Sequence, residues 1–70
     1  MADVLAPLAG KILAVLVEPG AKVEEDDELV VIEALKMENT VYAPEGGTVK
    51  AIKVKVGDSV EDAQLLLELE

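Results

Sequence analysis

Hydrophobic residues recur in short runs along the chain, and turn-forming residues interrupt them at regular intervals. The runs are rich in Val, Leu and Ile, and they are separated by Gly, Pro or acidic clusters. This pattern is typical of short β-strands, and no segment shows the spacing of a helix of normal length. We therefore expect an all-β domain, with strands at residues 4–6, 11–17, 23, 29–32, 41–42, 48–56, 60 and 65–69.

The pattern of strands and turns occurs twice. At an offset of 37 positions, residues 1–33 align with residues 38–70 without a gap, and 11 of the 33 pairs are identical. The segment Ala34–Met37 alone lies outside both copies. Eight short strands in two equal sets predict a closed or sandwiched sheet structure with internal pseudo-twofold symmetry. In such a structure the four extra residues form the tip of the hairpin that connects the two halves.

One strand in the second copy changes its alternation midway. The apolar and polar residues of 48–56 alternate with a single break, which indicates a bulge or a sharp bend. The alternation predicts that Lys50 and Lys53 face water, and so should their equivalents in the first copy, Leu13 and Leu16. Two interpretations of the leucines are open. They are ordinary isolated surface residues, or they form a small apolar contact patch for a larger partner.

Composition narrows the class of protein. Seventy residues make one small domain with one core, so we expect residues 1–70 to be a single domain. The chain contains neither cysteine nor histidine, and it therefore lacks the usual zinc ligands and the commonest general base. We expect no catalytic residue and no metal site of its own. No apolar run approaches the ~20 residues that cross a bilayer, and no signal peptide precedes Asp3. A soluble, cytoplasmic protein is expected.

The charge balance is strongly acidic. Six lysines face fifteen acidic residues, which gives a net charge of -9. Nucleic-acid binding needs a basic surface and usually aromatic platforms, so this class is excluded, and partners with positive surfaces are favoured. The acidic run 24–28 could be considered as a calcium site. Because it contains no glycine for a tight ligand loop and its alternate residues point apart, a solvated turn is the better interpretation.

Lys36 is the one charged residue in the central segment. A lysine amine is mostly protonated at neutral pH and is a poor nucleophile by itself. An enzyme that supplies an activated carboxyl group and a base can still acylate it, provided that the amine is held out on a rigid turn. Glu33 and Glu38 stay on the stems of such a hairpin, where they can guide a basic ligase pocket. Taken alone, Lys36 would be an ordinary solvated lysine.

The surroundings of Lys36 resemble a known family. Residues 33–38 read Glu-Ala-Leu-Lys-Met-Glu and resemble the Glu-Ala-Met-Lys-Met motif of the biotinyl domain, the biotin carboxyl carrier module. The Ala-Pro-x-x-Gly units at 6–10 and 43–47 are similar to those of the family, as are the turns at 19–20 and 57–58. The resemblance covers essentially the whole chain.

This resemblance implies both a fold and a modification. The fold is a flattened β-barrel of two four-stranded antiparallel sheets, with the modified lysine on a hairpin opposite the termini. By position, Lys36 would be biotinylated by a biotin protein ligase, with Ala34, Leu35 and Met37 as recognised neighbours. Biotin would then be a covalent cofactor, and the domain itself would not be an enzyme.

The resemblance also implies how the carrier works. It would carry an activated carboxyl group between partner active sites of a biotin-dependent carboxylase, decarboxylase or transcarboxylase. Its partners would be biotin carboxylase, carboxyltransferase or decarboxylase subunits. Leu35 departs from the family, which usually has Met there, although the two side chains have similar volumes. The alternative is a lipoyl carrier domain of a 2-oxo acid dehydrogenase or glycine cleavage complex. Ala34 and Met37 favour biotin.

Overall fold

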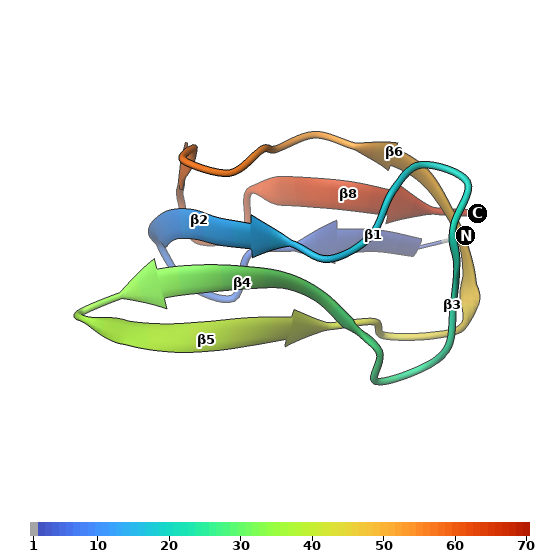
Figure 1. The fold of residues 1–70 in the computed structure, drawn as a ribbon, viewed down its shortest axis with the longest axis horizontal. Helices are drawn as coiled ribbons and strands as arrows, with labels where there is room; N and C mark the ends of the chain where they lie inside the picture. Colours follow the sequence, from blue (N-terminus) through green and yellow to red (C-terminus); the bar gives the residue numbers. More distant parts are fainter. Residues whose placement is uncertain (1) are drawn as a thin grey trace.

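Two four-stranded antiparallel sheets make up the computed structural model, which describes residues 2–70 (Figure 1). One sheet has the order β1-β8-β6-β3 and the other β5-β4-β2-β7. Each sheet contains strands from both copies of the repeat, so the all-β prediction with two four-stranded sheets is confirmed. The strands are β1 (Ala2–Leu5), β2 (Gly10–Val15), β3 (Lys22–Val23), β4 (Glu28–Ala34), β5 (Met37–Tyr42), β6 (Gly47–Ile52), β7 (Ser59–Val60) and β8 (Leu65–Leu69).

The pseudo-twofold symmetry extends to individual backbone hydrogen bonds. The Asp26 amide donates to the Ala43 carbonyl at 2.9 Å, and its equivalent, the Ala63 amide, donates to the Ala6 carbonyl at 2.8 Å. Asp26 and Ala63 also share a left-handed backbone, with φ of 71° and 66°. The two copies of the repeat therefore fold in the same way and exchange strands between the sheets.

Side chains cap the same turn in each copy. The Asp27 carboxylate accepts a hydrogen bond from the Glu24 amide at 2.8 Å, and the Gln64 amide oxygen accepts one from the Glu61 amide at 3.0 Å. The acidic run therefore includes a structured turn, because one of its carboxylates binds the backbone. The bonds are reciprocal, because the Asp27 amide donates to the Glu24 carbonyl and the Gln64 amide donates to the Glu61 carbonyl, each at 3.0 Å.

Most predicted strands have different limits in the structure: the strand expected over 4–6 covers Ala2–Leu5, and the strand expected over 41–42 begins at Met37. The strand expected over 48–56 ends at Ile52, the strand expected over 11–17 ends at Val15, and the strand expected over 29–32 extends to Ala34. The strands expected over 48–56 and 11–17 end early because the chain then crosses from one sheet to the other. Residues after Ile52 lead to β7, which pairs with β2 of the opposite sheet. Buried residues within such a crossover look like strand residues in the sequence.

A bulge interrupts the same strand in each copy, as the change in alternation predicted. The register shifts between Ile12 and Ala14 in β2 and between Val49 and Ala51 in β6. A bulge lets two successive residues lie on the outer side before the strand turns its next residue inward. It also increases the local twist, which helps two small sheets to wrap around one core.

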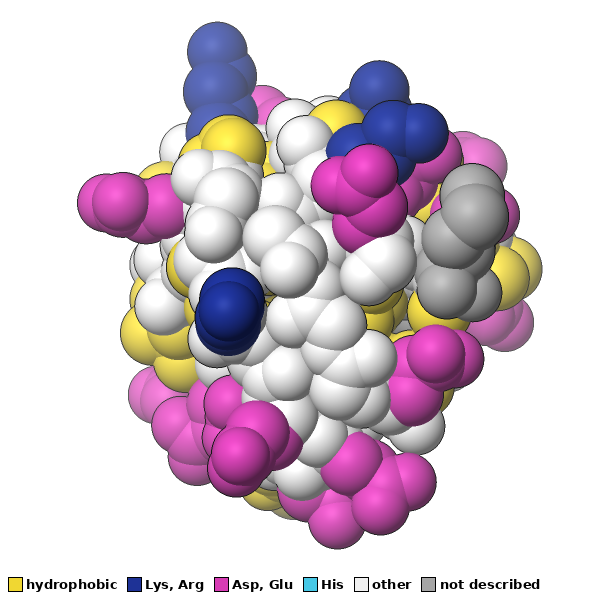
Figure 2. Space-filling view, turned by 90° about the vertical axis from the view of Figure 1, so that its right-hand side faces the viewer, with side chains coloured by type: hydrophobic (Ala, Val, Ile, Leu, Met, Phe, Trp, Pro, Cys, Tyr) yellow, Lys and Arg dark blue, Asp and Glu magenta, His cyan; other side chains and the backbone are white. Residues whose placement is uncertain are grey.

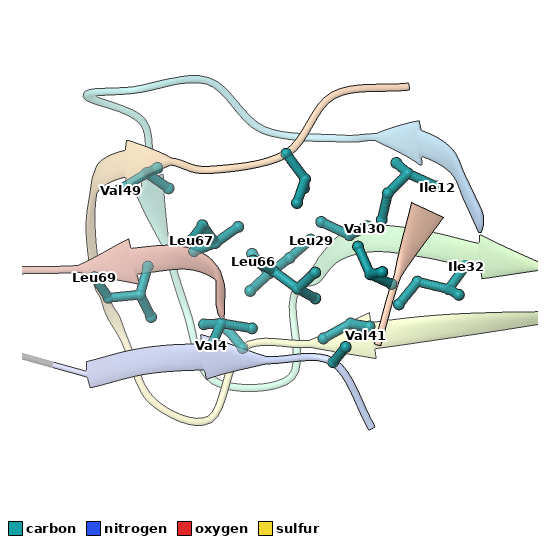
Figure 3. Close-up of a cluster of buried hydrophobic side chains, with 14 of the residues drawn as sticks. Val4, Ile12, Leu29, Val30, Ile32, Val41, Val49, Leu66, Leu67 and Leu69 are labelled. Carbon is teal, nitrogen blue, oxygen red and sulfur yellow. The ribbon is translucent and has the colours of Figure 1, made fainter. Parts of the chain in front are cut away.

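The core lies between the sheets and consists of Val, Ile, Leu and Ala alone (Figure 3). Leu29, Val30, Ile32, Leu66 and Leu67 are completely inaccessible to solvent. No polar or charged side chain is buried among the described residues. Because β4 contributes three of these five residues, the core fixes the register of the hairpin that β4 forms with β5. Residues 2–70 include no helix long and apolar enough to cross a membrane.

Candidate functional site

The central segment forms the tip of the β4–β5 hairpin. Glu33 pairs with Glu38 and Ala34 with Met37 in the antiparallel register, which leaves a turn of two residues. Figure 1 shows this tip at the left end of the molecule and both termini at the right end. The molecule measures 30 × 19 × 18 Å, so the tip and the termini lie at opposite ends of the long axis.

The two turn residues have an unusual backbone. Leu35 and Lys36 have φ of 53° and 65°, which is the pattern of a type I′ turn. This turn matches the twist of the flanking strands but normally contains Asn and Gly, because other residues are strained at positive φ. A strain on the order of 1 kcal/mol per residue persists only where the surroundings enforce it, and such residues gather at functional sites.

The side chains of the tip point away from the fold into solvent. Leu35 is 95% exposed and Met37 is 66% exposed, so two apolar side chains flank the exposed Lys36. Within residues 2–70, Lys36 makes no ion pair, whereas Lys53 does pair with Glu68. The ammonium group is therefore held out by the backbone alone and is open to a partner.

The sequence-predicted site residues come together at this tip. Glu33 and Glu38 are exposed and lie opposite each other on the stems, and Ala34 is half-buried at the start of the turn. The arrangement presents one amine and two apolar side chains, with two carboxylates behind them. The exposed amine therefore has charged and apolar neighbours on the same hairpin. Sequence reasoning missed the left-handed backbone of the turn, which no residue type at 35 or 36 signals.

The opposite end of the molecule has a different surface. Figure 2 shows acidic side chains along the lower margin of that end, and lysines together with further acidic side chains in its upper half and left of its centre. A shallow hollow there is lined by residues of β3, β6 and the acidic turn: Lys22, Val23, Glu24, Asp27, Gly47 and Thr48. No group of three or more acidic side chains within residues 2–70 is arranged to hold a metal ion.

The fold and the tip define a class of protein: a small β-module that presents one lysine on a hairpin. The family model described as "Biotin-requiring enzyme" matches residues 2–69. Biotin carboxyl carrier protein of acetyl-CoA carboxylase from Solanum lycopersicum is 46% identical over 66 residues, which are 94% of this chain and 94% of that protein. Pyruvate carboxylase from Bacillus subtilis is 45% identical over 96% of this chain and 6% of its own length.

Solved structures are similar as well. Kluyveromyces lactis urea carboxylase superimposes with a TM-score of 0.93 at 30% identity, over 99% of this chain and 6% of that one. The lipoyl domain of the 2-oxoglutarate dehydrogenase complex from Azotobacter vinelandii superimposes with a TM-score of 0.83 at 29% identity, over 100% of this chain and 96% of that one.

The chain belongs to the family of biotin-requiring enzymes and is a biotinyl carrier domain. Biotin is the cofactor that this family implies. The chain spans only 6% of the pyruvate carboxylase chain and 9% of the human propionyl-CoA carboxylase alpha chain, so in these relatives the domain is a small part of a much longer polypeptide.

Proposed function

We propose that Lys36 is the residue to which biotin is covalently attached. The observation that carries this proposal is the geometry of the tip, where a strained two-residue turn holds a fully presented lysine without an ion pair. The residues around it fit such a group, because the apolar side chains of Leu35 and Met37 flank the amine and are exposed. In this proposal, Ala34 completes the recognised segment.

The attachment is an acyl transfer onto the Lys36 amine. A biotin protein ligase would supply biotin with an activated carboxyl group and a base that removes a proton from the ammonium. The free amine then attacks the carbonyl carbon, the activating group leaves with its electron pair, and the nitrogen gives up a second proton to the ligase base or to water as the amide bond forms. Glu33 and Glu38 would guide a basic ligase surface toward the tip, since both carboxylates are exposed on the stems.

The modified domain would serve as a mobile carrier. Biotin supplies a ureido nitrogen that holds a carboxyl group for transfer. This chain supplies the tether, which makes the encounter with a second active site intramolecular and raises its effective concentration. Catalysis would belong to biotin carboxylase and to carboxyltransferase or decarboxylase subunits, so residues 1–70 would act as one non-catalytic domain. The cytoplasm is the proposed compartment.

A lipoyl carrier is the second candidate. Its support is the superposition on the lipoyl domain, which covers the whole of this chain. Both candidates use the same lysine and the same hairpin, so the fold does not distinguish them. Met37 follows the lysine here, whereas lipoyl domains typically have Ala at that position. This difference favours biotin.

Intact mass distinguishes the candidates directly. The unmodified protein is incubated with ATP, biotin and a biotin protein ligase, and in parallel with ATP, lipoate and a lipoate ligase. We expect one biotinyl increment and no lipoyl increment. Lys36→Arg is the matched control, because it keeps the positive charge at the tip and removes the acylated amine. A lipoyl increment alone would reassign the domain, and an increment retained in the control would place the attachment elsewhere.

A further inference from the structure

The outer faces of the two sheets differ in chemistry, although the repeat relates them position by position. On the sheet β1-β8-β6-β3, four outward positions are charged: Asp3, Lys50, Lys53 and Glu68. Their equivalents on the sheet β5-β4-β2-β7 are uncharged: Thr40, Leu13, Leu16 and Val31. The second copy therefore shows that these backbone positions accept charged residues.

Three of these uncharged residues, Leu13, Leu16 and Val31, lie on the outer side of this sheet together with Tyr42. Val31 lies between two completely buried residues of β4, so its own side chain points outward. Leu13 and Leu16 are not packed against the core, and Leu16 is 48% exposed. Tyr42, the only aromatic residue of the chain, is 52% exposed at the edge of the same sheet. We call Leu13, Leu16, Val31 and Tyr42 the apolar face.

This face spans three adjacent strands. In the register, Ala14 of β2 lies opposite Val31 of β4, and Val31 lies opposite Thr40 of β5. The Leu16 amide continues this pairing by donating to the Leu29 carbonyl at 2.8 Å. The equivalent positions on the other sheet hold an ion pair, in which the Lys53 ammonium lies 3.7 Å from the Glu68 carboxylate.

Carboxylates border the apolar face at both ends. Glu33 and Glu38 lie across from each other between the face and the tip, and Glu28 lies opposite Tyr42 at the other end. Lys11, opposite Glu33, is the one lysine on β2, β4 and β5. A complementary surface therefore has an apolar centre flanked by Lys or Arg side chains.

From this complementarity we propose that the apolar face docks the carrier onto the biotin carboxylase component, on a surface with an apolar centre and basic flanks. The inference rests on the proposed function, which names this component as a partner. A second copy of the chain does not fit, because both faces would bring acidic borders together and each molecule carries a net charge of -9. In the carboxylase relatives the matched domain is a small part of a far longer chain.

The position of the face suits a carrier. Two of the three strands that build the face, β4 and β5, also carry the tip, and Lys36 lies five positions after Val31. At the rise of an extended strand this is about 16 Å. Docking on the face would therefore fix the direction of the hairpin and leave the lysine arm free. A small contact of this kind belongs to the transient class of interfaces, which lets the carrier leave for its second site.

A transplant of side chains between the copies tests the proposal. The variant Leu13→Lys/Leu16→Lys/Val31→Glu places on this sheet the residues that the equivalent positions already hold. A second variant, Leu13→Gln/Leu16→Gln, removes apolar area without changing the net charge. Leu5→Gln is the matched control, because Leu5 is 49% exposed on the opposite sheet. Thermal unfolding of each variant establishes that it is folded.

Two readouts use the purified biotin carboxylase subunit of the source organism. Fluorescence anisotropy of the unmodified 70-residue chain gives the Kd, and carrier-dependent ATP hydrolysis with the biotinylated chain gives KM and kcat. Both face variants should raise Kd and KM by about tenfold or more, with kcat within about twofold, because two leucines lose their buried contacts. Leu5→Gln should leave all three values within about twofold. Added salt should raise Kd, since the borders are charged.

Other results would overturn the proposal. Unchanged Kd and KM in both face variants would show that the face is not a docking surface. If sedimentation shows that the parent chain is a dimer and that the variants are monomers, a second copy of the chain is the occupant of the face. If the variants are biotinylated more slowly than the parent chain, the ligase is the occupant. If the chain docks through the face but no ligase biotinylates it, this inference is supported. The proposed function is then refuted.

Discussion

Gly10 and Glu33 lie so close together on β2 and β4 that a side chain at position 10 has no space. A Cβ there would meet the Glu33 carbonyl and would lie 2.6 Å from the Cγ2 atom of Ile32. The repeat reproduces this relationship, because a Cβ at Gly47 would lie 2.8 Å from the carbonyl oxygen of Glu70. Glycine at position 10 thus allows β2 to support the stem of the tip hairpin.

Replacing this glycine should weaken the whole domain. We expect Gly10→Ala to lower the free energy of unfolding by about 1–3 kcal/mol, because the backbone of β4 must move to accept the methyl group. Gly46→Ala is the control: its Cβ would approach other atoms no closer than 3.4 Å, and we expect a change within about 0.5 kcal/mol. Urea unfolding measures both, and equal stabilities for the two variants would contradict the close contact.

The strain at the tip should be measurable. Leu35→Gly removes the steric cost of φ at 53° and should raise the free energy of unfolding by about 1 kcal/mol. Leu35→Ala is the control, because it removes the same exposed side chain and keeps most of the strain. Urea unfolding compares the two. A glycine variant no more stable than the alanine variant would show that the turn is unstrained.

The two capped turns should respond alike. Asp27→Ala and Gln64→Ala each remove the acceptor for one backbone amide, at Glu24 and Glu61. Each should cost about 0.5–1.5 kcal/mol, the usual net contribution of one hydrogen bond. Hydrogen exchange of the two amides gives a local readout, and each should exchange faster only in its own variant. If either variant alone makes both the Glu24 and the Glu61 amide exchange faster, the two turns are not independent.

Lys36 should contribute nothing to folding. Because it makes no ion pair within residues 2–70, Lys36→Arg should change the free energy of unfolding by less than about 0.5 kcal/mol. Lys53→Ala provides the comparison, since it breaks the ion pair with Glu68, and even this exposed pair should be worth only up to about 1 kcal/mol. A marked loss of stability in Lys36→Arg would mean that the lysine is held by the fold.

Much of the architecture was predictable because the chain repeats. The eight strands follow from apolar runs between turn residues, and the bulges of β2 and β6 follow from one break in the alternation, whereas the register shifts of the β1–β8 and β4–β5 pairs were not predicted. The limits of the strands were less predictable. Val54 is buried at 7% exposure although it lies beyond the end of β6, since the crossover between sheets also packs against the core. A buried residue in a crossover and a buried residue in a paired strand are both apolar, so the sequence does not distinguish them. The structure does, because it shows which residues pair.

The sequence by itself determined the all-β class, the internal symmetry and the position of Lys36 at the midpoint, because these depend on local residue types and on a repeat that needs no coordinates. The tertiary structure decided which strands share a sheet and that the tip turn is left-handed at Leu35 and Lys36. It also decided that Leu13, Leu16 and Val31 share one outer face. These properties depend on pairing between strands that are distant in the sequence. The pattern of one strand does not show which other strand it will pair with.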